Sequence, residues 1–224
     1  MKVVALIAAK GQSERVPEKN LRPFAGTNLV ELKLTQLSNL NCFDEIVLSS
    51  EDNRILSIGK KFQITLHKRN SHYSTDYIPM SDVYRYLASE VNGDVIAWIQ
   101  VNNPLVNPQR YEEAINVYNN LSNGYDCLLS VSRIKEYLFY EGKPVGFKPY
   151  PWPRSQDLKG CSKLNFAICI LKREDMIKWG SLVGNSPYFY YGDSIEFHDI
   201  DTPEDFLFCE TIYKSRAGKE QETL

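Results

Sequence analysis

The fold of this 224-residue chain is decided by the stretch Val3-Val4-Ala5-Leu6-Ile7-Ala8-Ala9-Lys10-Gly11-Gln12-Ser13-Glu14-Arg15-Val16-Pro17-Glu18-Lys19-Asn20. Its apolar first part predicts a buried parallel strand. In the polar loop that follows, Gly11 and Ser13 allow backbone N–H groups to approach a ligand closely. The loop also carries three cations, Lys10, Arg15 and Lys19. These features favour a site for nucleotide phosphates at the carboxyl end of the strand.

Two known phosphate-binding motifs do not fit this loop. Neither G-x-x-x-x-G-K-[ST] nor G-x-G-x-x-G matches its spacing, so the P-loop and the dinucleotide fingerprint are excluded. An ordinary strand-to-helix loop with solvated charges stays open as an alternative.

The composition is that of a globular protein with one substantial core, with 43% hydrophobic and 24% charged residues. A formal charge of −2 argues against a nucleic-acid binder that works by bulk electrostatics. The five cysteines are odd in number and widely spaced, which favours reduced core thiols over disulfides or a metal site. No stretch reaches membrane-spanning length and the N-terminus lacks a signal sequence, so we expect a cytoplasmic protein.

Short apolar runs alternate with helical patterns, which is typical of a mostly parallel sheet flanked by helices. Strands are predicted at 3–8, 45–49, 63–67, 95–100, 127–131 and 166–171. Helices are predicted at 53–62, 81–91, 108–121, 173–179 and 203–213. A further helix begins at Leu29, with Asn28 as its N-cap and Glu31 in the capping-box position. We expect the charged residues 214–224 to be frayed.

Residues 133–163 interrupt this alternation. Six aromatic residues lie here among glycines and prolines: Tyr137, Phe139, Tyr140, Phe147, Tyr150 and Trp152. The pattern indicates a hairpin or an irregular arm rather than a crossover helix. The arm either folds onto its own subunit or contacts a second one. We favour contact with a second subunit, because aromatic residues are enriched in interface cores.

Asp199 and Asp201 are separated by one residue, so an extended segment directs both carboxylates to the same side. Paired hard oxygen ligands suit Mg²⁺ that also holds substrate phosphates. A strand end followed by a helix start at residues 202–205 accounts for the same pattern without a metal. A basic loop and a carboxylate pair are the two halves of a nucleotidyl-transfer site, however, so we predict Mg²⁺ here. His198 is predicted to pack beside the pair rather than to act as a base.

The chain resembles the cytidylyltransferases that activate sialic acid (acylneuraminate) and related acidic sugars as CMP conjugates. The resemblance rests on residues 8–26, on Cys42-Phe43-Asp44-Glu45-Ile46-Val47-Leu48-Ser49-Ser50, on Ile99-Gln100-Val101-Asn102-Asn103-Pro104-Leu105 and on Asp199-Ile200-Asp201-Thr202-Pro203-Glu204-Asp205. It departs from the family at Lys10, where arginine is usual, and at residues 101–104, where the family has Pro-Thr-Ser-Pro.

The resemblance implies one α/β nucleotidyltransferase domain over residues 1–224, with a mostly parallel, Rossmann-like sheet of the nucleotide-diphospho-sugar transferase type. It implies that residues 133–163 are an inserted dimerisation arm, which helps to close the acceptor site of a partner subunit in a homodimer. The implied reaction is attack of an acidic sugar on the α-phosphorus of CTP, aided by Mg²⁺, with release of pyrophosphate.

The same resemblance assigns the site residues. The nucleotide is expected on Ala8, Lys10, Gly11, Ser13, Arg15, Lys19, Asn20, Arg69 and Ser81, with Arg69 helping to read the cytosine. The expected catalytic residues are Lys19, Asp199 and Asp201, the last two as metal ligands. The acceptor is expected on Gln100, Lys163 and Asn165, and the sequence offers Arg154, after Trp152-Pro153, as a further residue for anion recognition. Lys163 replaces a family arginine that holds the sugar carboxylate, and Phe166 replaces a common glycine, so the identity of the acceptor stays open.

Two other functions stay open. A phosphorylated acceptor would give a CDP-linked product, and loss of catalysis would leave a nucleotide-binding regulatory module. Retention of Lys19, Asp199 and Asp201 argues against the regulatory module. Neither nucleic acid nor a membrane is expected as a partner.

Overall fold

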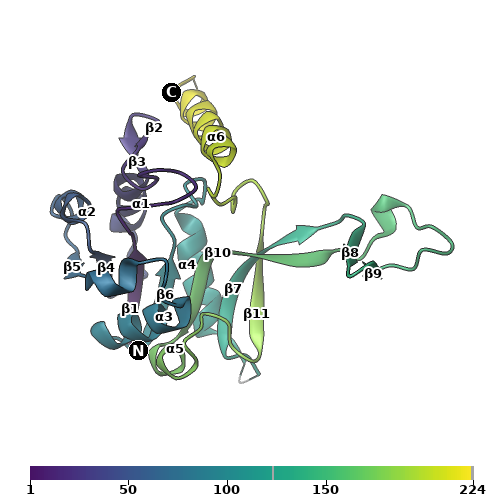
Figure 1. The fold of residues 1–224 in the computed structure, drawn as a ribbon, viewed down its shortest axis with the longest axis horizontal. Helices are drawn as coiled ribbons and strands as arrows, with labels where there is room; N and C mark the ends of the chain where they lie inside the picture. Colours follow the sequence, from purple (N-terminus) through teal and green to yellow (C-terminus); the bar gives the residue numbers. More distant parts are fainter. Residues whose placement is uncertain (123, 223–224) are drawn as a thin grey trace.

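The computed structural model describes residues 1–122 and 124–222, with the side chains of residues 217–222 left aside. A seven-stranded sheet lies at the centre, in the order β11-β7-β10-β6-β1-β4-β5 (Figure 1). All its pairings are parallel except the two made by β10. The strands are β1 (Val3–Ala8), β4 (Glu45–Ser50), β5 (Thr65–Lys68), β6 (Val95–Ile99), β7 (Cys127–Ile134), β10 (Cys161–Lys172) and β11 (Pro187–Gly192).

Helices cover both faces of the sheet. They are α1 (Leu29–Ser38), α2 (Asn53–Gly59), α3 (Met80–Glu90), α4 (Gln109–Asn119), α5 (Arg173–Trp179) and α6 (Pro203–Glu222), with the 3₁₀ turns η1 (Ser71–Ser74) and η2 (Ser155–Asp157). A short hairpin, β2 (Pro23–Phe24) with β3 (Thr27–Asn28), precedes α1. Among the residues described, no helix is both long enough and apolar enough to cross a bilayer.

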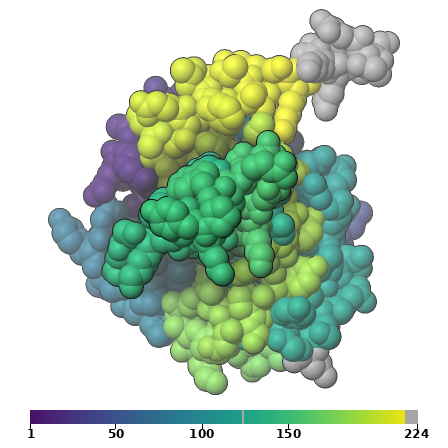
Figure 2. Space-filling view, turned by 90° about the vertical axis from the view of Figure 1, so that its right-hand side faces the viewer, coloured from purple at the N-terminus to yellow at the C-terminus, as the bar shows by residue number. Residues whose placement is uncertain are grey.

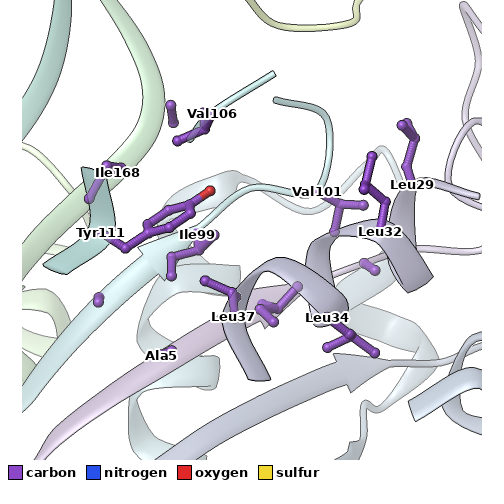
Figure 3. Close-up of a cluster of buried hydrophobic side chains, with 14 of the residues drawn as sticks. Ala5, Leu29, Leu32, Leu34, Leu37, Ile99, Val101, Val106, Tyr111 and Ile168 are labelled. Carbon is purple, nitrogen blue, oxygen red and sulfur yellow. The ribbon is translucent and has the colours of Figure 1, made fainter. Parts of the chain in front are cut away.

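The alternation of side chains along β1 divides the core in two. Ala5 packs on the face covered by α1 and α4 (Figure 3), whereas Leu6 packs on the face covered by α3 and α5. Both are fully buried, as expected of a central parallel strand with helices on either side. The expected α/β class with a mostly parallel sheet is therefore confirmed.

The predicted strands and helices are all present, with shifts at their ends. The strand predicted at 63–67 begins later, as β5. Strand β7 ends later than predicted and β10 begins earlier than predicted, so both extend into the arm. Asn28 caps α1 as predicted, because its side chain accepts a hydrogen bond from the Glu31 N–H. Strand β11 was not predicted, since its four consecutive aromatic residues show no alternation. The predicted helix end at Tyr213 is wrong: α6 continues to Glu222, and residues 223–224 lie outside the described residues.

The arm extends away from the sheet as a ladder of β7 and β10, followed by a hairpin of β8 (Leu138–Tyr140) and β9 (Lys143–Val145) (Figure 1). Figure 2 looks at the molecule with the arm toward the viewer. The rings of Tyr137, Phe147 and Trp152 pack on one another, with centroids 4.9–5.6 Å apart. The predicted hairpin is therefore present, and its aromatic residues contact each other within the arm.

Candidate functional site

A cavity of about 350 Å³ opens at the carboxyl ends of the central strands. Ala8 ends β1, Gln100 follows β6 and Arg69 follows β5, and all three line the cavity. Strand β1 has β4 on one side and β6 on the other, so the cavity lies where the winding of the sheet reverses, the usual ligand position in open α/β sheets. Seven of the predicted site residues line it: Ala8, Lys10, Ser13, Lys19, Asn20, Arg69 and Gln100.

The loop after β1 is held by its own polar groups. The Asn20 side chain donates to the Lys10 carbonyl at 2.8 Å, which closes the loop on itself. Lys10 pairs with Asp76 across the cavity, and sequence analysis did not identify Asp76 because nothing in its local pattern marks it. Two of the loop cations, Lys10 and Lys19, therefore line the cavity from a backbone that the loop itself holds.

Gly11 packs against the start of α2. Its N–H donates to Glu51 at 2.7 Å, and the residue is not among those that line the cavity. A Cβ at this position would lie 2.3 Å from a carboxylate oxygen of Asp52. Close packing against Asp52 therefore favours glycine here, and contact of Gly11 with a nucleotide stays a prediction.

Arg69 lies at the inner wall of the cavity and is only 5% exposed. Its Nε donates to the Ser49 hydroxyl at 3.1 Å and an Nη to the Ser49 carbonyl at 2.7 Å. Burial lowers the pKa of the guanidinium because a charged group loses hydration. Ser81, expected to bind nucleotide with Arg69, lies in the first turn of α3 next to Met80, which lines the cavity.

Asp199 and Asp201 meet the basic loop. They lie in the segment between β11 and α6, on either side of fully buried Ile200. An oxygen of Asp201 lies 3.0 Å from a guanidinium nitrogen of Arg15 and 3.7 Å from Nζ of Lys19. In Figure 1 the loop after β1 and the segment before α6 lie at the same end of the sheet. The two halves predicted from sequence are therefore adjacent.

This segment is held in place on both sides. The Ile200 N–H donates to the Asn102 carbonyl at 2.9 Å, and its own carbonyl accepts from Lys19 Nζ at 2.6 Å. Asp205 accepts from the Thr202 N–H at 2.8 Å, a capping interaction at the start of α6. His198 contacts Asp205 at 2.9 Å. The helix start that sequence analysis weighed as an alternative thus coexists with the paired carboxylates.

Lys19 is the most enclosed of the three loop cations, with a side chain 16% exposed. Burial lowers its pKa, while the charge of Asp201 acts in the opposite direction. A partly desolvated ammonium interacts strongly with an incoming anion because little water remains to compete.

Asp199 and Asp201 are the carboxylates on which a metal was predicted. Among residues 1–122 and 124–222, no three His, Cys, Asp or Glu side chains gather into a metal site. A pair suits Mg²⁺, which binds one or two carboxylates and completes its shell with water and substrate phosphates.

The predicted acceptor residues are dispersed. Lys163 and Asn165 line a second cavity of about 220 Å³, and Lys163 Nζ lies 3.9 Å from Asp199. The Asn165 amide is bonded to Ser130 and Ser132 of β7, which supports the irregularity in β10. Arg154 lies on the arm, exposed and paired with Asp157 at 2.7 Å. Only Gln100 lies in the first cavity, so these residues do not form one acceptor pocket within one subunit.

Comparison with known proteins identifies the family. The model of a family described as cytidylyltransferase matches residues 4–143, more than half of the chain. The chain belongs to this cytidylyltransferase family. The match includes the basic loop, Arg69, Gln100 and the first part of the arm.

Individual relatives agree with this assignment. The chain is 27% identical over 217 residues to N-acylneuraminate cytidylyltransferase A of Danio rerio, covering 93% of this chain and 50% of the relative. It is 24% identical to the CMP-N,N'-diacetyllegionaminic acid synthase of Legionella pneumophila, covering 95% and 96%. The chain thus spans half of the fish enzyme and nearly all of the bacterial one.

A solved structure shows the same fold. CMP:2-keto-3-deoxy-manno-octonic acid synthetase complexed with CTP superposes with a TM-score of 0.66 at 16% identity, over 99% of this chain and 100% of the other. At this identity the likeness shows a shared fold and nothing further.

Proposed function

We propose that this cytidylyltransferase transfers CMP from CTP to an acidic sugar of the sialic-acid type, or to a related acidic metabolite, and releases pyrophosphate. The observation that carries the proposal is the contact between Arg15 and Asp201, which joins a phosphate-type loop to a carboxylate pair at the rim of a cavity large enough for a nucleotide. The acidic-sugar enzymes among the relatives support the choice of acceptor.

The cations supply the charge that the triphosphate requires. Lys10 pairs with Asp76, and Arg15 and Lys19 contact Asp201. On binding, CTP would replace these carboxylates as their partner and place its β- and γ-phosphates among them. Phosphoryl transfer needs mainly positioning and charge neutralisation, so this arrangement stabilises the departing pyrophosphate.

Asp199 and Asp201 are the residues that would hold Mg²⁺. When bound, the ion would neutralise phosphate charge and lower the pKa of an attacking hydroxyl. Lys19 keeps the segment in place through the Ile200 carbonyl, so the carboxylates are positioned before any ligand binds.

The arm favours a homodimer in which each subunit helps to complete the acceptor site of the other. Phe139 is 55%, Tyr150 88% and Trp152 58% exposed, a large apolar surface for a projecting hairpin. Arg154 lies on this arm, which projects away from the sheet (Figure 1), and it lines neither the first nor the second cavity. We therefore expect it to meet an acidic acceptor in a second subunit.

A pyrophosphate-release assay tests the function. Each of the four nucleoside triphosphates is combined with Mg²⁺ and with a panel of acidic sugars and phosphorylated metabolites. We expect release with CTP and an acidic sugar, and a CMP ester as the product. A diphosphate-linked product would favour the phosphorylated acceptor instead, and no release with any pair would support a regulatory module.

A further inference from the structure

A chain of polar side chains runs from the inner wall of the cavity to the surface. Arg69 Nε donates to the Ser49 hydroxyl at 3.1 Å, and this hydroxyl lies 3.0 Å from Nδ1 of His67. On the other side of the ring, Nε2 of His67 lies 3.3 Å from a carboxylate oxygen of Glu90. Ser49 is fully buried and Glu90 is half exposed. The four residues come from β4, β5, the turn after β5, and the end of α3.

The directions of donation follow from the chemistry of each group. Arginine can only donate, so the Ser49 oxygen accepts from Arg69 and its own proton is free to go to His67. His67 then has an unprotonated Nδ1 and its proton on Nε2, whose polar neighbours are the Glu90 carboxylate at 3.3 Å and the Tyr86 hydroxyl at 3.5 Å. The carboxylate of Glu90 thereby selects the tautomer that the hydroxyl needs.

His67 also contacts the cavity wall by a second route. Its Nε2 lies 3.5 Å from the Tyr86 hydroxyl, and the Tyr86 ring stacks on Tyr73 with centroids 3.9 Å apart. Tyr73 lines the cavity together with Arg69. Within the described residues, Arg69 forms no ion pair with a carboxylate, so its orientation depends on Ser49 and on what holds Ser49.

We propose that His67 is a positioning residue that sets the orientation of Arg69 for the nucleotide base through Ser49, with Glu90 fixing the histidine tautomer. The proposal rests on the proposed function and on the base-binding role that the family resemblance implies for Arg69. His67 touches no ligand itself, and the Ser49 hydroxyl is buried and engaged, so neither acts as a nucleophile.

The test compares KM and kcat for CTP and UTP at pH 8. We expect His67→Ala and Ser49→Ala to raise the KM for CTP about tenfold with a smaller change in kcat, and to weaken discrimination against UTP. His67→Asn keeps an acceptor for the Ser49 proton, so it should restore the wild-type KM and the discrimination against UTP.

Two control variants separate the possible outcomes. Thr65→Ala on the same strand removes a surface hydroxyl that bonds Glu45 and should change nothing. Arg69→Ala should abolish the preference for CTP. If it does not, the base-binding role of Arg69 is wrong, and not only its positioning by His67 and Ser49. If Arg69→Ala acts as expected while His67→Ala and Ser49→Ala keep the wild-type KM and the wild-type discrimination against UTP, only the positioning role of His67 is overturned. A similar loss in His67→Asn and His67→Ala at pH 8 would also overturn it.

Discussion

Asp201 contacts two cations of the basic loop: its carboxylate pairs with Arg15 and lies near Nζ of Lys19. We expect Asp201→Ala to lower kcat about a hundredfold or more, since the loss of a main electrostatic group acts on the transition state. The side chain is 38% exposed, so the fold should survive. Steady-state kinetics with circular dichroism measures both, and Glu204→Ala, an exposed carboxylate of the same segment, is the matched control. Near-wild-type kcat in Asp201→Ala would contradict the assigned role.

Lys33 provides a prediction about stability. It is fully buried under α4, donates to the Asn103 carbonyl at 2.9 Å and to Tyr111 at 2.6 Å, and burial lowers its pKa to about 7. Between about pH 7 and the ordinary lysine value the unfolded chain binds the extra proton, so folding stability should rise with pH by up to about 1.4 kcal/mol per unit.

Lys33→Met removes this titration. Urea unfolding at pH 7 and pH 9 should therefore show that the wild type gains stability relative to Lys33→Met as the pH rises. Tyr111→Phe, which keeps the lysine, serves as the control and should retain the gain. An equal pH dependence in the wild type and Lys33→Met would show that the buried amine keeps an ordinary pKa.

At the scale of elements, the alternation of apolar runs predicted the parallel strands other than β11, because a strand buried on both faces needs a continuous apolar sequence. It could not show that β10 runs antiparallel, since direction depends on the arm that precedes it. Lys33 shows the same limit: it lies between leucines on α1, and only the packing of the loop after β6 and of α4 buries it.

The candidate site was predictable to a similar degree. The basic loop and the Asp199–Asp201 pair carry local patterns, and the structure brings them together. Asp76 and the His67 chain consist of single residues without a motif, so only their positions in space identify them.

Phe166 in β10 gives a prediction at this scale. Its φ of 55° lies in the left-handed region, which costs a residue with a Cβ about 1 kcal/mol relative to glycine. Its ring packs against the core on the α3 side, so both Phe166→Ala and Phe166→Gly should be less stable than the wild type. Phe166→Gly should be about 1 kcal/mol more stable than Phe166→Ala in thermal or urea unfolding. The reverse order would mean that the backbone is unstrained.

At the scale of the whole molecule, the projecting arm and its exposed rings are the main features that a single subunit leaves unexplained (Figure 2). We expect light scattering to give twice the 25.8 kDa mass of the chain. Replacing Phe139, Tyr150 and Trp152 together by serine should yield a folded monomer with little activity, since burial of large aromatic side chains dominates such contacts. A fully active monomer at micromolar concentration would restrict the arm to contacts within itself.

Complementation tests whether the arm acts across subunits. The triple serine variant keeps an intact carboxylate pair, and Asp201→Ala keeps an intact arm. If each arm completes the site of the other subunit, a mixed dimer contains one site with both parts, and mixing two nearly inactive proteins should restore activity in proportion to the mixed dimers formed. The Asp201→Ala protein by itself, which has intact arms but no intact carboxylate pair, should show no such gain in activity. Dimers that form in the mixture without any gain in activity would mean that the arm joins the subunits but contributes nothing to catalysis.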